Sequence, residues 1–202
     1  MNLRAILGDT RGFTLAELLI SAAMMASILA AAMVSVQVGT QSSVTATGRA
    51  EAQGNARFVL DRIVREVRAA GYDPTNAGFE AVTGQSASSV TLQSDLNGNG
   101  VIEAPAGPCD PNALTERVRY RRVGTTILRS ADPNDGACEA TLIAGVQALE
   151  FTYLQANATV TAISADIRTI RVSLTVVPES ATASQTGVMA ATMADQARLR
   201  NR

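Results

Sequence analysis

The sequence predicts an α+β protein in which one long, hydrophobic N-terminal helix packs on an antiparallel β-sheet head. The apolar and helix-forming runs lie before residue 72, whereas short alternating runs separated by turn residues follow Gly78. No helical segments alternate with these runs, so a parallel sheet built from crossover units is not expected. We expect the helix over residues 13–71 and the head over residues 72–202.

The first element is an apolar stretch from Phe13 to about Val38, preceded by a short polar segment, residues 1–12. From Leu18 to Val38 a helix rising about 1.5 Å per residue can cross a hydrocarbon core of about 30 Å. Arg4 and Arg11 precede this stretch, which predicts a cytoplasmic N-terminus and an exported head. The apolar run is too long for an ordinary signal peptide, and no clear small-residue cleavage site follows it.

Glu17 places a carboxylate near the start of this membrane helix. Deep and unpaired, such a group costs about 2.5 kcal/mol or more. Two interpretations remain open at this point: Glu17 lies at headgroup level, or it pairs with a positive charge from a neighbouring subunit. If the chain is cut between Gly12 and Phe13, Glu17 lies one helical turn from a new amine.

Residues 11–19, RGFTLAELL, resemble the class III signal of type IV prepilins and type II secretion pseudopilins. The resemblance implies that a prepilin peptidase cuts after Gly12 and methylates the new N-terminal Phe13. It also implies that Glu17 supports assembly by matching the amine of an adjacent subunit. One departure is Ala16, where the family usually has a bulky apolar residue.

The second half of the helix has a clear amphipathic pattern. Apolar residues recur at helical spacing at Val59, Leu60, Ile63, Val64 and Val67, and Gly71 is a natural stop. Residues 55–72, NARFVLDRIVREVRAAGY, resemble the corresponding helix of PilW-type minor pilins, with the J-type pseudopilin of type II secretion as the alternative. The stretch from Gly39 to Ala56 is small and polar, and it predicts either a bendable segment or a continuous helix held by packing.

Five strands are expected in the head, at residues 89–93, 117–123, 126–130, 146–154 and 169–177. Gly124 separates the second and third and marks a hairpin. The tail, residues 190–202, fits either a last strand or a helix.

Cys109 and Cys138 are the only cysteines in the chain. Export to an oxidising compartment makes a disulfide between them the expected state, with two separate reduced thiols as the alternative. Closing a loop of about 30 residues stabilises a fold by roughly 3 to 4 kcal/mol in the chain-entropy model.

Residues 95–103, DLNGNGVIE, are similar to the first part of a calcium loop. The ligands would be Asp95, Asn97 and Asn99, the carbonyl of Val101, and Glu103 directly or through water. The twelfth position, normally a bidentate glutamate, is Ala106, and two asparagines lower the charge. We therefore expect weak calcium affinity, unless Asp110 or another acid closes the site, or simply a glycine-asparagine β-turn.

The composition excludes several function classes. With no histidine, the chain has no Ser-His-Asp or Cys-His pair, and nothing indicates an enzyme or a required cofactor. A net charge of −1 and the lack of tryptophan do not suit a nucleic-acid binder.

The resemblance instead implies a minor pilin that helps initiate or prime a type IV pilus, with a tip position left open. A type II secretion pseudopilin and a tip adhesin are the alternatives. Implied partners are other major and minor pilins, the prepilin peptidase and the inner-membrane assembly platform. The chain would span the inner membrane once, with its head in the periplasm, before entering a filament on the cell surface.

Overall fold

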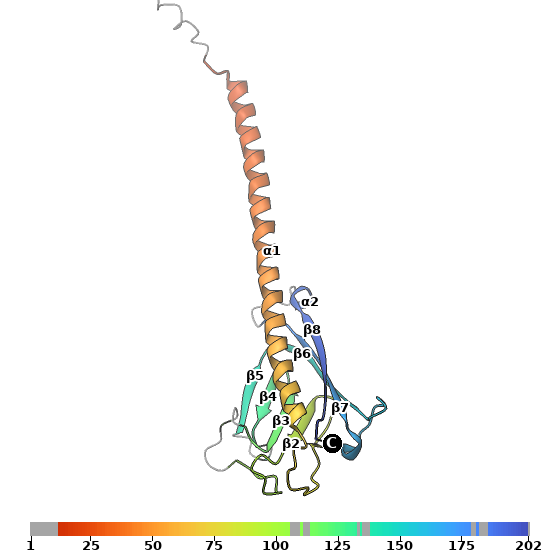
Figure 1. Cartoon of the computed structure of the whole chain (residues 1–202). Helices are drawn as coiled ribbons and strands as arrows, with labels where there is room; N and C mark the ends of the chain where they lie inside the picture. The colour runs from red at the N-terminus through yellow and green to blue at the C-terminus, as the bar shows by residue number, and fades with distance from the viewer. Residues whose placement is uncertain are drawn as a thin grey trace, which may run out of the picture. The chain divides into compact units, whose positions relative to one another are not determined.

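The computed structural model describes residues 12–105, 110, 114–132, 134, 138–178, 181 and 186–201. Within these residues the chain forms one long helix, a series of short strands and two short helical turns (Figure 1). Their bounds are α1 (Leu15–Ala69), β1 (Val82–Thr83), β2 (Ser89–Gln93), β3 (Arg117–Val123), β4 (Thr126–Ser130), β5 (Glu139–Ile143), β6 (Val146–Leu154), η2 (Ser164–Asp166), β7 (Thr169–Val176), α2 (Thr186–Met189) and β8 (Ala191–Arg198).

The chain divides into two compact units, residues 1–44 and residues 45–202. The described part of the first unit is the N-terminal portion of α1 with the residues just before it, and all of it is exposed. Among the described residues α1 is the one helix long and apolar enough to cross a membrane, with an 18-residue window of mean hydropathy 2.2. Burial in lipid would account for the exposure of its large apolar side chains. We call the second unit, residues 45–202, the head.

Helix α1 runs without interruption through the small and polar stretch between Gly39 and Ala56. Gly48, Ala52 and Ala56 are buried at four-residue intervals, so this face of α1 packs against other residues of the head. A Cβ atom on Gly48 would come within 2.8 Å of Met189 Sδ and 3.3 Å of Pro178 Cγ, so a side chain there would displace Met189. Of the two alternatives left by the sequence, the structure has the continuous helix.

The helix ends where the sequence predicts. Gly71 adopts a φ of 77°, a left-handed conformation that glycine reaches without steric cost. Its N–H donates to the carbonyl of Gln93 at 2.8 Å, which ties the end of α1 to β2.

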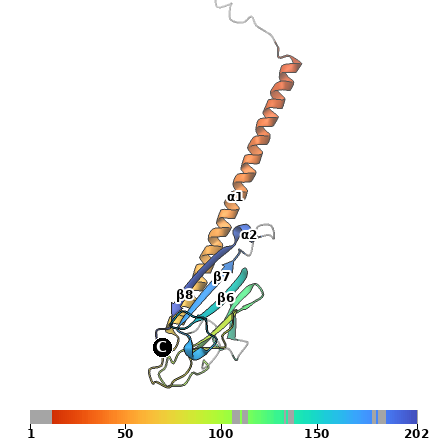
Figure 2. The ribbon, with the colours of Figure 1, turned by 90° about the vertical axis from the view of Figure 1, so that its right-hand side faces the viewer.

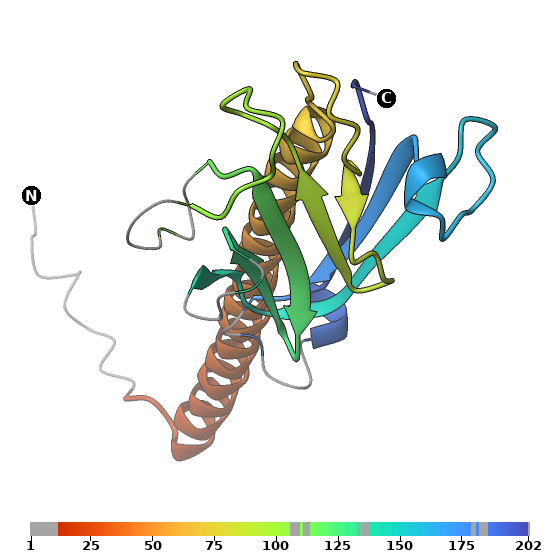
Figure 3. The ribbon, with the colours of Figure 1, turned by 90° about the horizontal axis from the view of Figure 1, so that it is seen from below.

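The strands form two antiparallel sheets, in the orders β1-β2-β3-β4-β5 and β6-β7-β8. Figures 1 and 3 show the first sheet on one side of the C-terminal part of α1 and the second on the other. A single sheet was expected from the sequence, so the division into two sheets is a finding of the structure. The predicted hairpin between β3 and β4 is confirmed, with Val123 opposite Thr126 and Gly124 at a φ of 58°.

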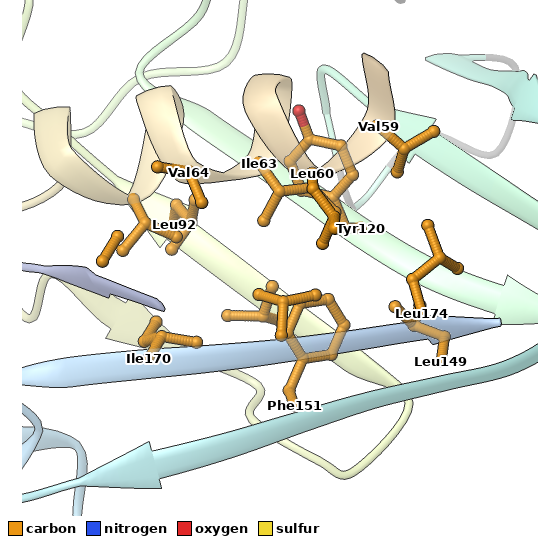
Figure 4. Packing of buried hydrophobic residues seen from close by; sticks show 14 of the residues in the cluster. Val59, Leu60, Ile63, Val64, Leu92, Tyr120, Leu149, Phe151, Ile170 and Leu174 are labelled. Atoms are coloured by element: carbon orange, nitrogen blue, oxygen red, sulfur yellow. The ribbon is translucent and has the colours of Figure 1, made fainter. Parts of the chain in front are cut away.

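One hydrophobic core joins α1 to both sheets. Figure 4 shows the apolar stripe of α1 facing Leu92 and Tyr120 from the first sheet and Phe151, Ile170 and Leu174 from the second. Val59, Ile63 and Val67 are each fully buried, as the helical spacing predicts. The helix is therefore the common support on which the two sheets are arranged.

The arginine-rich strand β3 has one buried face and one face that is partly exposed to solvent. Glu139 of β5 accepts a hydrogen bond from Arg119 at 2.7 Å and others from Arg121. These guanidinium hydrogen bonds, those of Arg121 foremost, lower the pKa of Glu139. On the solvent-facing side of this sheet, the arginines of β3 thus reach across β4 to form ion pairs with Glu139 of β5.

Candidate functional site

The predicted cleavage position lies directly before α1. Gly12 is exposed, Phe13 is 87% exposed, and the helix begins two residues later at Leu15. A Cβ atom on Gly12 would meet nothing within 4 Å. Residues 1–11 of the predicted leader lie outside the described residues. Both residues that flank the predicted cleavage site are therefore accessible to a protease.

Thr14 and Glu17 form a reciprocal cap at the start of α1. The Glu17 N–H donates to Thr14 Oγ1 at 3.2 Å, while Glu17 Oε2 accepts from the Thr14 N–H at 3.0 Å and from its hydroxyl at 2.9 Å. This pattern is the capping box, in which a threonine and a glutamate three residues later satisfy the first N–H groups of a helix. A carboxylate is also stabilised there by the helix dipole.

The cap positions the group that the sequence singled out for assembly. Glu17 Oε1 takes no part in these three bonds, so this exposed oxygen remains available on the first helical turn. Thr14 was not among the predicted functional residues. The threonine-to-glutamate spacing of the capping box was the signal that could have identified it.

The loop from Asp95 to Glu103 is organised around the carboxylate of Asp95, which is completely buried. Its Oδ1 accepts from the N–H groups of Gly98 at 2.7 Å and Asn99 at 3.2 Å, and its Oδ2 accepts from that of Gly100 at 2.8 Å. Asn97 and Asn99 each accept, at 2.8 Å, from the N–H two residues further on. The predicted ligands are thus brought into one tight loop.

Glu116, directly before β3, holds this loop through backbone N–H groups. Its Oε1 accepts from the N–H groups of Leu96 and Asn97 at 3.2 Å each, and its Oε2 accepts from that of Glu103 at 2.9 Å. No local sequence pattern connects Glu116 with the loop, which is why sequence reasoning missed it. Asp110, the acid named for this role, is exposed.

The oxygen-rich donor set fits a hard cation such as calcium better than a transition metal. Within the described residues, no three His, Cys, Asp or Glu side chains gather in a metal-binding group. A calcium ion would therefore depend on the amide oxygens of Asn97 and Asn99 and the carbonyl of Val101, together with Asp95 and Glu103.

The predicted disulfide falls partly outside the structure. Cys138 is buried, with 1% of its surface exposed, directly before β5. Cys109 lies outside the described residues, so its bridge to Cys138 stays a prediction.

An ion pair that the sequence did not predict joins the C-terminal part of α1 to β4. Arg129 of β4 is 1% exposed, and its Nη2 donates to Glu66 Oε1 at 3.1 Å. Tyr120 is buried beside them, and burial followed by the charge of Glu66 raises the pKa of its hydroxyl. This pair fixes the first sheet against the helix and belongs to the support of the head.

Comparisons with known proteins give a likeness in structure but none in sequence. No protein-family model matches the sequence, and no curated protein matches it. Among solved structures the chain is similar to a type IV-like pilin from Thermus thermophilus, at 12% sequence identity and a TM-score of 0.47, over 74% of this chain and 97% of that chain.

Proposed function

We propose that this chain is a structural subunit of a type IV pilus-type filament. The observation that carries the proposal is the arrangement of residues 12–17: an exposed Gly12-Phe13 bond stands immediately before a helix of membrane length, and the first turn of that helix holds an exposed carboxylate. Cleavage there would create an amine one turn from Glu17. In a lipid-like environment a carboxylate and an amine from neighbouring subunits would each satisfy the other's charge.

Within this function we infer a PilW-type minor pilin that helps initiate or prime assembly, supported by the pattern of residues 55–72 in α1. A J-type pseudopilin of type II secretion and a tip adhesin are the alternatives. The partners would be other pilins, the prepilin peptidase and the inner-membrane platform. The head would face the periplasm and then the cell exterior, an oxidising location that supports a Cys109–Cys138 bridge.

The function is tested by changing Glu17→Gln, which keeps the shape of the side chain and removes its charge. We expect the amount of chain in sheared filaments to fall at least about tenfold, a loss of about 1.4 kcal/mol in assembly free energy, because the neighbouring amine loses its counter-charge. The amount in the membrane should stay unchanged. Quantitative immunoblots of both fractions measure this ratio.

Glu51→Gln is the matched control, since Glu51 is exposed on the same helix within the head. It should assemble as the wild type does. If Glu17→Gln enters filaments at the wild-type level, or if the wild-type chain is never found in them, the proposal is wrong.

We further propose that the loop from Asp95 to Glu103 binds calcium weakly, supported by its turn pattern. Asp95, Asn97 and Asn99 place side-chain oxygens at alternate positions, as calcium loops do, and each accepts a backbone N–H two to five residues on. A dissociation constant of about 0.1 to 1 mM is expected, typical of extracellular calcium modules. Binding to the folded state alone would raise the melting temperature.

The calcium proposal is tested by thermal unfolding of the full chain in detergent, with calcium and with magnesium. We expect calcium to raise the melting temperature and Glu103→Gln to abolish that rise, because the variant removes a charged ligand from an exposed position. Glu150→Gln, an exposed carboxylate on β6, should leave the rise intact. Equal effects of the two metals, or no effect of calcium, would contradict a calcium site and leave the loop as a turn.

A further inference from the structure

The head carries an open groove between α1 and β8. Figure 2 shows β8 next to α1, followed by β7 and β6. The groove has a volume of about 580 Å³ and is lined by Arg49, Ala50, Gln53, Gly54 and Arg57 of α1 and by Ala190, Ala191, Thr192 and Met193. All of these residues belong to the head.

Two contacts connect α1 with the C-terminal part of the chain on either side of β8. At one end Gly48 approaches Met189, and at the other the side chain of Asn201 donates to the carbonyl of Ala69 at 3.3 Å. The floor between these contacts is made of small residues, and a Cβ atom on Gly54 would meet nothing within 4 Å. Another backbone can therefore approach closely.

One wall of the groove is the edge of a sheet. β8 pairs with β7 along its whole length, and no strand among the described residues pairs with its other side. The Leu199 N–H donates to the carbonyl of Arg168, the residue before β7, at 2.9 Å, so the backbone groups of Leu199 face β7. Because backbone groups alternate along an antiparallel strand, the N–H and C=O groups of Thr192, Ala194 and Gln196 point outward.

The outward groups near the groove are the ones left for a partner. The Gln196 N–H already donates to its neighbour Asp195 at 2.7 Å. In the described part of the chain, no comparable acceptor is seen for the outward N–H groups of Thr192 and Ala194. An exposed strand edge of this kind is a template for an added strand.

The other wall is positively charged. Arg49, Gln53 and Arg57 recur at four-residue intervals and so form one stripe along α1, and none of the described residues that line the groove is acidic. Arg57 is exposed and forms no ion pair with the described residues. Guanidinium groups bind carboxylates with charge-assisted, geometrically specific hydrogen bonds.

We propose that this groove binds an extended, acidic polypeptide segment, which adds as a strand to β8 and places carboxylates against the arginine stripe. Backbone pairing with Thr192 and Ala194 supplies affinity, and the arginines select the side chains. Eight helical residues separate Arg49 from Arg57, about 12 Å along the axis. Four residues of strand span about 13 Å, so acidic residues four positions apart on one face fit best. The proposal does not depend on the filament function.

The probe is a short, end-blocked peptide of alternating valine and threonine, with two glutamates four positions apart. Its control is the same peptide with lysines in place of the glutamates. Binding to the full chain in detergent micelles is measured by fluorescence polarisation, and amide hydrogen exchange locates the site. We expect the glutamate peptide to bind at least about tenfold more tightly than the lysine peptide, in line with the strength of charge-assisted hydrogen bonds. Exchange should slow at Thr192 and Ala194.

Arg57→Glu should reverse the preference between the two peptides. Arg65→Glu, at another exposed position of α1 outside the groove, should leave it unchanged. Ala194→Pro removes an outward N–H without removing a bond to β7, and it should weaken binding of both peptides. If the proline variant has a lowered melting temperature, its weaker binding could reflect unfolding, and the result for Arg57→Glu decides.

Two results would overturn the proposal. One is the absence of glutamate-peptide binding. The other is binding that neither slows exchange in β8 nor responds to Arg57→Glu, since the peptide would then lie elsewhere on the head.

Discussion

A chain with Gly12→Val is expected to reach the membrane and to keep its leader, residues 1–12. A β-branched side chain next to the scissile bond restricts the backbone and blocks the close approach that glycine permits. The substitution should cost the fold nothing, because Gly12 is exposed and a Cβ atom there would meet nothing within 4 Å. The intact mass of the membrane-purified protein should therefore exceed that of the wild type by the whole leader, and filaments should lack the variant.

Gly39→Val provides the control, because this glycine is also exposed with nothing within 4 Å of a Cβ atom. It should be cut normally. The same mass spectrum of the wild type should show a chain that starts at N-methylated Phe13 and is lighter by two hydrogens than its reduced form, as a Cys109–Cys138 bridge requires. A Gly12→Val chain that starts at Phe13 would falsify the assigned cleavage position.

Replacing Arg129 by methionine is expected to destabilise the head by about 3 kcal/mol, since Glu66 loses its buried partner and keeps only the ion pair with Arg62, at 3.6 Å. Arg129 is 1% exposed and Glu66, its partner, has a side chain that is 17% exposed. The exposure of Glu66 places the expected loss at the lower end of the range for buried pairs. Denaturant unfolding of the full chain in detergent measures the change in the free energy of unfolding.

Two further variants separate the ion pair from general damage. The double variant Arg129→Met with Glu66→Leu should regain a large part of the loss, because no buried charge is then left alone. Arg121→Met removes an arginine that is 37% exposed and leaves Glu139 paired with Arg119, so it should cost about 1 kcal/mol or less. Equal losses for Arg129→Met and Arg121→Met would contradict the role assigned to the buried pair.

The alternation of apolar and polar residues predicted the strands that have one buried and one solvent-exposed face. β2, β3, β4 and β6 have the predicted bounds, and β7 ends one residue earlier than expected, at Val176. β5 and the two-residue β1 were not predicted. In β5 none of the residues is fully buried, so its sequence lacks a clear apolar face.

The last strand shows what local pattern cannot supply. β8 contains three alanines, an aspartate and a glutamine, residues with little preference for strands. It is held by eight register pairs with β7, a long-range pairing that no local spacing encodes. The division into two sheets is non-local for the same reason.

The candidate site was predictable to the extent that it is local. Residues 12–17 and the loop from Asp95 to Glu103 are short motifs whose members lie close in sequence, and the structure places each set together. Glu116 and the Glu66–Arg129 pair are brought to their partners only by the fold. The groove likewise needs both α1 and β8 and could not be predicted from either alone.

The position of β8 in chain order also imposes a sequence of events on maturation. Ala197 and Leu199 complete the core that begins with Ala56 and Val59 on α1. The helix can therefore be fully covered only after segments about 140 residues later have been synthesised. A chain still being exported has the helix in place but not its last covering strand. The groove wall and the finished core therefore arise in the same final step, which delays recognition through β8 until the head is complete.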